Sequence, residues 1–284
     1  MSRRIGIVVH RHRPEVIDFA KAAVRWCEEN AASVHLPAGD ASLIGLPDSA
    51  VDADEFAADL DLVVSLGGDG TMLRAVQFAA PHDVPILGIN AGQLGYLTQF
   101  DSSEMVGALD AWRKGALVEE RRMLLEVTVR GDRRHPAAFA LNETVLERAD
   151  SGHSVSVDAS IGGVRFTSYL ADGVIVATPT GSTAYSLSAG GPIVEPDFEA
   201  LLVTPVAPHM VFDRSLILKP STVVELTVSG YRNGKVTVDG RLVTELEPGE
   251  TLVCKASDRR VRFLTRSERN FHGILKEKFN LEDR

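Results

Sequence analysis

The spacing of apolar residues changes near Arg121, and this change divides the chain into two parts of different structural class. Before it, buried strand-like runs alternate with segments whose apolar residues recur every three to four positions, as on a helix. After it, apolar and polar residues alternate one by one, for example over 125–130 and 224–229, which is typical of strands with one buried face.

The first part predicts a parallel sheet with crossover helices. Strands and helices alternate in it, and this order indicates parallel strands that are joined by helical crossover connections. We expect strands at 4–9, 34–36, 61–66 and 85–89, and helices at 14–27, 71–80 and 102–114. Pro37, Gly39, Gly45 and Pro47 are expected to prevent regular structure over a long stretch after the second strand.

The second part predicts antiparallel sheet followed by a helix at 268–279. Asn233 and Gly234 predict a two-residue hairpin turn, because both central positions of such a turn need positive φ. Further strands are expected at 155–161, 164–169, 174–178, 252–255 and 260–265. The predicted fold class is thus an α/β N-terminal domain with a parallel sheet (1–120), an all-β C-terminal domain (121–265), and a terminal helix (266–284) that packs back on the N-terminal domain.

Charge and composition restrict the function. A net charge of −9 argues against a nucleic-acid binder, and the basic residues of 255–278 are interspersed with apolar ones, as on a solvated strand and helix face. Two distant cysteines fit a reducing cytoplasm. Since no apolar run has the length of a signal or membrane segment, we expect a cytoplasmic protein without a membrane partner.

A glycine-rich loop follows the strand at 61–66 directly. Residues 67–71 have the sequence Gly-Gly-Asp-Gly-Thr, and a helical pattern begins at once. In an open α/β sheet, ligands bind at this edge, where the next helix offers N–H groups to an anion. Glycines let the backbone approach a phosphate. A tight turn capped by Asp69 or Thr71 has the same composition, so this loop alone leaves both interpretations open.

A second loop is rich in hydroxyl groups. Residues 177–188 carry seven hydroxyl side chains, and Gly190 and Gly191 follow. Local turns made by Ser and Thr side chains give a similar composition. Because the loop leaves an apolar strand and contains Tyr185, it also suits a phosphate-bearing, polyhydroxylated ligand with a ring.

Together the two loops resemble the NAD kinase family. The resemblance rests on 67–71 and on 178–185 (Thr-Pro-Thr-Gly-Ser-Thr-Ala-Tyr), and runs in order from about residue 62 to 220. The pair Asn142–Glu143 and residues 88–97 are similar to further segments of that family. The first loop is also similar to that of diacylglycerol, sphingosine and 6-phosphofructo-kinases, whereas the second is highly specific.

The resemblance implies transfer of a phosphoryl group from ATP, another triphosphate or polyphosphate to the 2′-hydroxyl of the adenosine ribose of NAD, which makes NADP. It implies that Asp69 is the catalytic residue that accepts the proton of that hydroxyl. Gly67, Gly68, Gly70 and Thr71 would form the phosphate loop. A divalent cation, Mg²⁺, is expected as cofactor, without a metal site made of protein side chains alone.

Other residues are implied to bind substrate. Arg74 would face the same phosphates, Asn142 and Glu143 would hold ribose hydroxyls, and Asp172 would contact the nicotinamide or ribose side. The adenosine pocket and one further ligand position would comprise Thr183, Ala184, Tyr185, Ser186, Leu187, Ser188 and His153. We expect both loops to contact one ligand, because neither alone supplies a phosphate cradle and a base pocket.

Some residues depart from the family pattern or have simpler interpretations. Gln93 stands where Asn is frequent, and Arg241 stands where Gln is often found. The resemblance therefore does not define the role of Arg241 at the edge of the dinucleotide pocket. His10 and His12 lack a third ligand of suitable spacing, so we interpret them as loop histidines rather than a metal pair.

Two other functions remain open from the sequence. A lipid kinase shares the first loop, although the acidic chain shows little sign of the apolar groove or basic surface that a lipid acceptor needs. A non-catalytic sensor of NAD or NADP would keep the pocket residues without consuming a phosphoryl donor. Edge strands in the β domain favour a homo-oligomer, a dimer or a tetramer.

Overall fold

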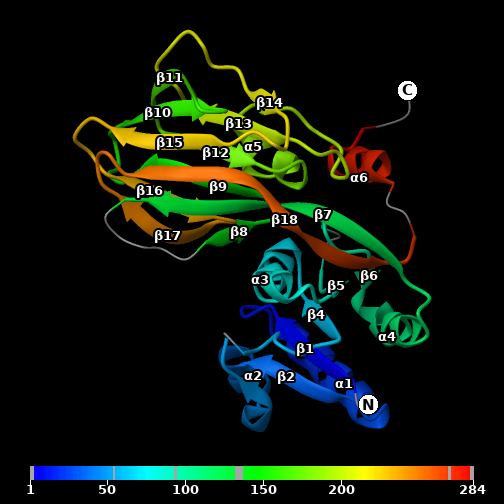
Figure 1. Ribbon diagram of the computed structural model, residues 1–284. Helices are drawn as coiled ribbons and strands as arrows, with labels where there is room; N and C mark the ends of the chain where they lie inside the picture. The colour runs from blue at the N-terminus through cyan, green and yellow to red at the C-terminus, as the bar shows by residue number, and fades with distance from the viewer. Residues whose placement is uncertain (1–2, 54, 93–94, 132–136, 268–269, 282–284) are drawn as a thin grey trace. The chain divides into compact units, whose positions relative to one another are not determined.

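The computed structural model describes residues 3–53, 55–92, 95–131, 137–267 and 270–281 (Figure 1). Two compact units are present, one of residues up to 121 together with those from 260 onward, and one of residues 122–259. Strands β7 (Val118–Arg130) and β18 (Thr251–Thr265) contribute residues to both units. Gln93, Leu94 and Glu268, which the sequence places in a family segment and at the start of the terminal helix, lie outside the described residues.

The first unit contains a parallel sheet. Its strands follow the order β18, β5, β4, β1, β2, β3, each parallel to its neighbour, and β6 is also parallel to β5. Its elements are β1 (Arg4–Val9), α1 (Glu15–Glu29), β2 (Ser33–Pro37), α2 (Ala38–Ile44), the 3₁₀ helix η1 (Pro47–Ser49), β3 (Ala50–Val51), β4 (Leu62–Leu66), α3 (Asp69–Ala79), η2 (Ala80–His82), β5 (Ile86–Asn90), β6 (Phe100–Asp101), η3 (Ser102–Glu104), α4 (Met105–Arg113) and α6 (Phe271–Lys278).

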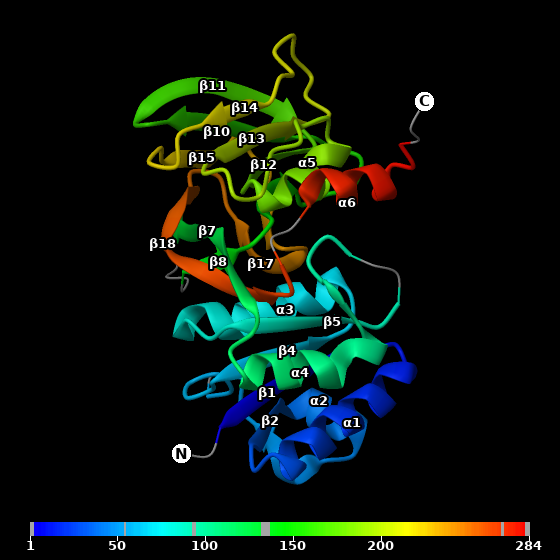
Figure 2. The same ribbon diagram turned by 90° about the vertical axis from the view of Figure 1, so that its right-hand side faces the viewer.

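Helices cover both faces of this sheet (Figure 2). Ile5, Ile7 and Val9 on alternate positions of β1 pack into one core with buried residues of α1, α2 and α4. Helix α3 contacts β1, β4 and β5 on the other face, where a Cβ at Gly88 would lie 2.7 Å from the Met72 sulfur. The close approach of α3 to β5 therefore depends on that glycine.

The stretch after β2 is regular, contrary to the expectation from its prolines and glycines. Helix α2 occupies Ala38–Ile44, with Pro37 at its N-cap position and Gly45 at its C-cap with φ +79°. Proline is tolerated at a helix start and glycine readily takes the left-handed conformation that ends a helix. These residues therefore mark the two ends of a helix instead of interrupting one.

The second unit contains two antiparallel arrangements of strands. In one, β11, β10, β15 and β18 are neighbours in that order, and β7 pairs with β18 and β8; in the other the order is β14, β13, β12, β9, β16, β17. Apolar residues of both form one core. The elements are β8 (Ala138–Ala140), β9 (Glu143–Arg148), β10 (Val155–Ile161), β11 (Val164–Ala171), β12 (Gly173–Ala177), η4 (Thr180–Thr183), α5 (Tyr185–Ser188), β13 (Leu201–Val206), β14 (Leu216–Leu218), β15 (Val224–Ser229), β16 (Gly234–Val238) and β17 (Arg241–Leu246).

The predicted hairpin at Asn233–Gly234 is wrong. Strand β15 pairs with β10 and β18, whereas β16 pairs with β9 and β17, so the two strands belong to different sheets. Gly234 is instead a packing position, because a Cβ there would lie 2.7 Å from a methyl group of Leu146. Asp239–Gly240, at +47° and +74°, is a two-residue turn with positive φ at both positions, between the paired strands β16 and β17. Gly162–Gly163, at +60° and +80°, is another, between β10 and β11.

The predicted fold class is confirmed: an α/β unit with a parallel core, antiparallel β-structure, and a C-terminal helix. Lys278 of α6 lies with its Nζ 5.7 Å from the ring centroid of Tyr96 in the same unit. Cys27 and Cys254 are buried free thiols. Among the described helices, none is long and apolar enough to cross a membrane.

Candidate active site

The glycine-rich loop joins β4 to α3 at the carboxyl end of the parallel strands. The Gly67 N–H donates to the Ile89 carbonyl at 2.9 Å, which ties the loop to the end of β5. A Cβ on Gly67 would overlap the Thr71 hydroxyl. Gly67 is thus required by the shape of the turn, in which it packs against Thr71.

Gly68 and Gly70 have no such structural reason to be glycine. A Cβ at either position would meet no atom of the described residues within 4 Å. Gly68 has an ordinary extended backbone with φ −97°, and Gly70 lies in the first turn of α3, which is capped by no side chain from the part of the chain that the structure describes. Space is therefore left beside the free N–H groups of a helix N-terminus, which is a favourable place for an anion.

Asp69 is held by a neighbouring segment of the same unit. Its Oδ2 accepts the Tyr96 N–H at 2.9 Å, and its Oδ1 accepts the Leu97 N–H at 3.0 Å. A Cβ on Gly95 would overlap this carboxylate. Asp69 thus has a structural role that sequence reasoning did not find, and its action as a proton acceptor stays a prediction.

Arg74 lies one helical turn beyond the loop and is engaged within the chain. Its guanidinium donates to the Val9 carbonyl at 2.9 Å and to the carboxylate of Asp40 at 2.5 Å. Asp40 is fully buried and also accepts from Arg11 Nε and the Val9 N–H, both at 3.0 Å. Asp40 therefore fixes two guanidinium groups near the end of β1, and contact of Arg74 with a phosphate stays a prediction.

The segment after β1 adds further positive charge close to the loop. The His10 N–H donates to the Leu66 carbonyl, and Arg13 donates to the Ala91 carbonyl at 2.7 Å. Burial, followed by the charges of Arg13, His12 and Arg74, lowers the pKa of His10 against the opposing charge of Glu15. The surroundings of the loop are thus basic, although the whole chain is acidic.

In the second unit, Asn142 and Glu143 form the turn into β9. Only 7% of Glu143 is exposed, and its Oε2 has no hydrogen-bond partner among the described residues. Burial and the charge of Asp239 raise the pKa of Glu143 to about 7, against the opposing effect of a hydrogen bond from the Tyr185 backbone.

Most hydroxyl groups of the second loop are engaged within the unit, which is the simpler of the two interpretations of its composition. They shape the loop by side-chain hydrogen bonds. The bonds join Thr178 to the Leu141 carbonyl, Thr180 to Arg122, Ser182 to both backbone groups of Val194, Thr183 to the Thr180 carbonyl, and Ser186 to Thr204.

Tyr185 remains partly exposed beside several acidic groups. Burial, then Glu147, Asp172 and Glu143, raise its pKa, so the structure brings Tyr185, Asp172 and Glu143 together. Asp172 accepts a hydrogen bond from Arg148 at 2.8 Å. Ala184, Leu187 and Ser188 lie in or next to the short helix α5 with partial or full exposure, and His153 is exposed in the turn between β9 and β10.

Sequence reasoning missed three charged residues that hold these segments. Asp40 lies in a stretch expected to be irregular, and buried Arg122 stands at the change of period. Asp239 accepts hydrogen bonds from the Leu141, Asn142 and Glu143 backbone. Only Asp239 had a usable signal, because Asp-Gly between two alternating strands is a hairpin pattern.

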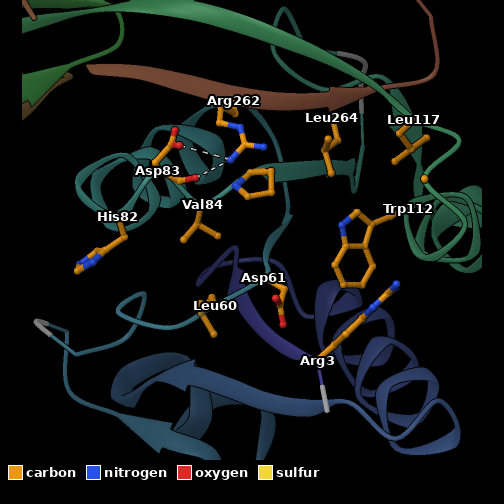
Figure 3. A pocket seen from close by; sticks show the side chains of 12 residues that line it. Arg3, Leu60, Asp61, His82, Asp83, Val84, Trp112, Leu117, Arg262 and Leu264 are labelled. Atoms are coloured by element: carbon orange, nitrogen blue, oxygen red, sulfur yellow. Dashed lines mark hydrogen bonds and ion pairs between the residues drawn. The ribbon is translucent and has the colours of Figure 1, made fainter. Parts of the chain in front are cut away.

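A pocket of about 530 Å³ lies elsewhere in the first unit (Figure 3). Arg3, Asp61 and Pro85 line it just before β1, β4 and β5, so it lies at the amino ends of the strands, at the edge opposite to the glycine-rich loop. Its Arg262 is already bound to Glu119 at 2.6 Å and lies 3.6 Å from Asp83. We therefore do not assign the chemistry to this pocket.

Two family comparisons cover most of the chain. Residues 5–116 match the ATP-NAD kinase N-terminal domain, and residues 141–266 match the ATP-NAD kinase C-terminal domain. The NAD kinase of Heliobacterium modesticaldum is 37% identical over 277 residues, which cover 96% of this chain and 97% of the relative. The chain belongs to the NAD kinase family. NAD kinase 1 of Streptomyces coelicolor is 39% identical, over 99% of this chain and 86% of the relative.

Solved structures agree with membership of the NAD kinase family. The crystal structure of yeast NADH kinase with NADH matches with a TM-score of 0.90 at 27% identity. The match covers 100% of this chain and 89% of the yeast chain. An NAD kinase from Archaeoglobus fulgidus, in complex with ATP, has a TM-score of 0.76 at 25% identity, covering 98% of this chain and 100% of that one. The chain is thus a phosphotransferase of this family.

Proposed function

We propose that this chain phosphorylates NAD: it transfers the terminal phosphoryl group of ATP to the 2′-hydroxyl of the adenosine ribose and releases NADP and ADP. The observation that carries the proposal is the open space at Gly68 and Gly70 beside Asp69, in a chain whose relatives are NAD kinases along nearly their whole length. Two glycines without a structural requirement leave room for a phosphate group.

Donor phosphates bind at the N-terminus of α3 in this proposal. The free N–H groups of the first turn and the guanidinium group of Arg13 favour an anion there. Arg11 and Arg74 share the one negative charge of Asp40, so this group of three side chains keeps one positive charge. Phosphoryl transfer depends chiefly on alignment and on charge stabilisation rather than on covalent chemistry. The loop supplies both.

Asp69 acts as the proton acceptor in the same proposal. Each of its carboxylate oxygens accepts one backbone N–H, which fixes its position and leaves further lone pairs on both oxygens. A positioned base of this kind contributes about 10² to 10⁴ in rate. Asn142, Glu143, Asp172 and Tyr185 are proposed to bind the dinucleotide.

We propose that Mg²⁺ enters as the complex with ATP. Among the described residues, no three His, Cys, Asp or Glu side chains are grouped as metal ligands. Mg²⁺ usually keeps several waters and binds substrate phosphates with few protein carboxylates, so its entry with ATP needs no cluster of protein ligands. The cation neutralises charge on the transferred phosphoryl group.

We further propose that the chain acts in the cytoplasm as a homo-oligomer, without a nucleic-acid or membrane partner. Its net charge of −9 disfavours binding to polyanions. Among the described strands, β14 and β17 end one sheet order, and a sheet edge is a surface on which a second copy can pair. Light scattering of the purified protein tests whether it is a dimer or a tetramer.

The decisive experiment incubates the purified protein with NAD, ATP and MgCl₂ and measures NADP with an NADP-specific dehydrogenase. We expect NADP to form and to require both ATP and Mg²⁺, so that omission of ATP or addition of EDTA stops it. Parallel reactions with polyphosphate and with NADH identify the preferred donor and acceptor.

Two other results would contradict the proposal. Binding of NAD by calorimetry without NADP formation would indicate a sensor. Phosphorylation of diacylglycerol or sphingosine in preference to NAD would indicate a lipid kinase.

A further inference from the structure

The backbone N–H groups of the turn at Leu141–Glu143 are held by one side chain, that of Asp239. The N–H groups of Leu141, Asn142 and Glu143 all donate to the carboxylate of Asp239, at 2.8, 2.8 and 3.2 Å. In return the Asp239 N–H donates to the Glu143 carbonyl at 2.9 Å. One aspartate thus binds all three N–H groups and one carbonyl of this turn.

The other two carbonyl groups of the turn are held by Thr178. The Thr178 hydroxyl donates to the Leu141 carbonyl at 2.5 Å, and the Thr178 N–H donates to the Asn142 carbonyl at 2.9 Å. A Cβ on Gly181 would overlap that same Asn142 carbonyl. Every backbone polar group of the turn therefore has a partner, from Asp239 or from Thr178.

Asp239 reaches this turn because of its own backbone. It is the first central residue of the β16–β17 hairpin, in which Val238 pairs with Arg241. Both central residues have positive φ, which matches the twist of a two-residue hairpin and which aspartate tolerates better than most residues. Strand β16 also pairs with β9, up to Val238 opposite Thr144, which brings the hairpin beside the turn.

The turn carries a buried polar atom that lacks a partner. Glu143 Oε2 is inaccessible to solvent and has no hydrogen-bond partner among the described residues. A buried acceptor of this kind gains most from a donor that arrives with a ligand. The position of this oxygen depends on how the backbone of the turn is held. Asp239 makes most of the hydrogen bonds to that backbone.

We propose that Asp239 is a positioning residue for the dinucleotide: it holds the Asn142–Glu143 turn so that the unpartnered Glu143 oxygen can accept a hydroxyl hydrogen of a bound ribose. This inference rests on the proposed function. Asp239 acts through the turn and does not contact the reacting atoms.

The test compares Asp239→Asn with a core variant of the same unit, Val157→Ala. Asparagine keeps the size of the side chain and tolerates positive φ, but its NH₂ group replaces one of the two acceptor oxygens. Val157 lies on β10, whose strand partners are β11 and β15, so its truncation lowers stability without touching the turn.

We expect Asp239→Asn to weaken NAD binding at least about tenfold, measured by calorimetry and as KM for NAD, while KM for ATP changes less than about twofold. Val157→Ala should lower the melting temperature and leave both constants within about twofold. Gly240→Ala, which strains the same hairpin at φ +74° but keeps the carboxylate, should weaken NAD binding by a smaller factor and serves if Asp239→Asn does not fold.

Equal changes in the NAD and ATP constants would overturn the proposal, as would the same loss of NAD binding in Val157→Ala. Unchanged NAD binding in whichever hairpin variant folds would overturn it as well. Failure of the proposed function is a separate result, because it appears in the wild-type protein as NAD binding without NADP formation. The ratio of NAD affinities between variant and wild type tests the role of Asp239 in either case.

Discussion

Three carboxylates illustrate how differently the protein balances a negative charge. Asp40 is paired with the guanidinium groups of Arg11 and Arg74. Asp239 relies on three backbone N–H groups. Glu143 has one buried oxygen without a partner among the described residues. Burial of a charge is costly unless the charge is compensated, so Glu143 is the carboxylate whose protonation we expect to respond near neutral pH.

Glu143 should make the stability of the ligand-free protein depend on pH. Its pKa rises from 4.5 to about 7 on folding, so between these values the folded chain binds more protons than the unfolded chain. The free energy of unfolding should therefore fall as pH increases through this range, by up to about 3 kcal/mol. Glu143→Gln removes this loss, and urea unfolding of both proteins from pH 5 to 8 measures it.

The difference in stability between Glu143→Gln and wild type should increase with pH, because all other titrating groups are common to both proteins. Parallel curves would show that Glu143 has an ordinary pKa in the folded protein.

Asp69→Asn should lower kcat at least about 100-fold, because an amide cannot accept the proton of the ribose hydroxyl. It should also lower the free energy of unfolding by about 1 to 3 kcal/mol, since the amide NH₂ then faces one of the N–H groups of Tyr96 and Leu97. Steady-state rates and a melting curve measure the two effects.

Asp61→Asn is the matched control for this variant. Asp61 precedes the same strand, β4, and its carboxylate also accepts a backbone N–H, that of Arg4 at 2.7 Å. Its kcat should remain near that of wild type. A nearly normal rate in Asp69→Asn would refute its assignment as the base.

At the scale of elements, the same residue type serves opposite purposes in the two loops. Gly181 is a glycine because the Asn142 backbone occupies the position of its Cβ. Gly70 lies in the first turn of α3 with open space around that position. Gly70 therefore serves a purpose other than the packing of the first loop.

Gly70→Ala and Gly181→Ala should differ in the sign of their effect on stability. Alanine at Gly70 should leave the free energy of unfolding unchanged or raise it by up to about 1 kcal/mol, yet reduce NADP formation by filling the phosphate space. Alanine at Gly181 should destabilise the protein by about 1 to 3 kcal/mol. Chemical unfolding and steady-state rates distinguish them, and full activity in Gly70→Ala would contradict binding of phosphate at this loop.

At the scale of the whole molecule, one ligand is expected to involve both loops, which the sequence places in different parts of the chain. Hydrogen exchange with and without NAD tests this expectation. Protection should appear in 67–71 and in 178–188, and NAD at 100 times its dissociation constant should add about 2.7 kcal/mol to the stability. Protection confined to one loop would show that the two motifs bind separate ligands.

Local sequence patterns were sufficient to predict much of the fold. The apolar run of β4, the body of α3 and the alternation of β10 and β15 depend on residues close together in the chain, so periodicity alone identifies them, although α3 begins at Asp69, two residues before the predicted start. The resemblance to the NAD kinase family came from two short motifs and needed no structure either.

Tertiary structure decided which of these elements pair and which side chains are engaged. Asn-Gly and Asp-Gly are equally good turn signals, but only the strands around Asp239–Gly240 pair with each other, because β15 belongs to another sheet. Sequence could not show that Asp40 binds Arg74, or that Asp239 binds the backbone of residues almost 100 positions earlier. Those contacts depend on long-range packing, which brings distant residues together and has no local pattern.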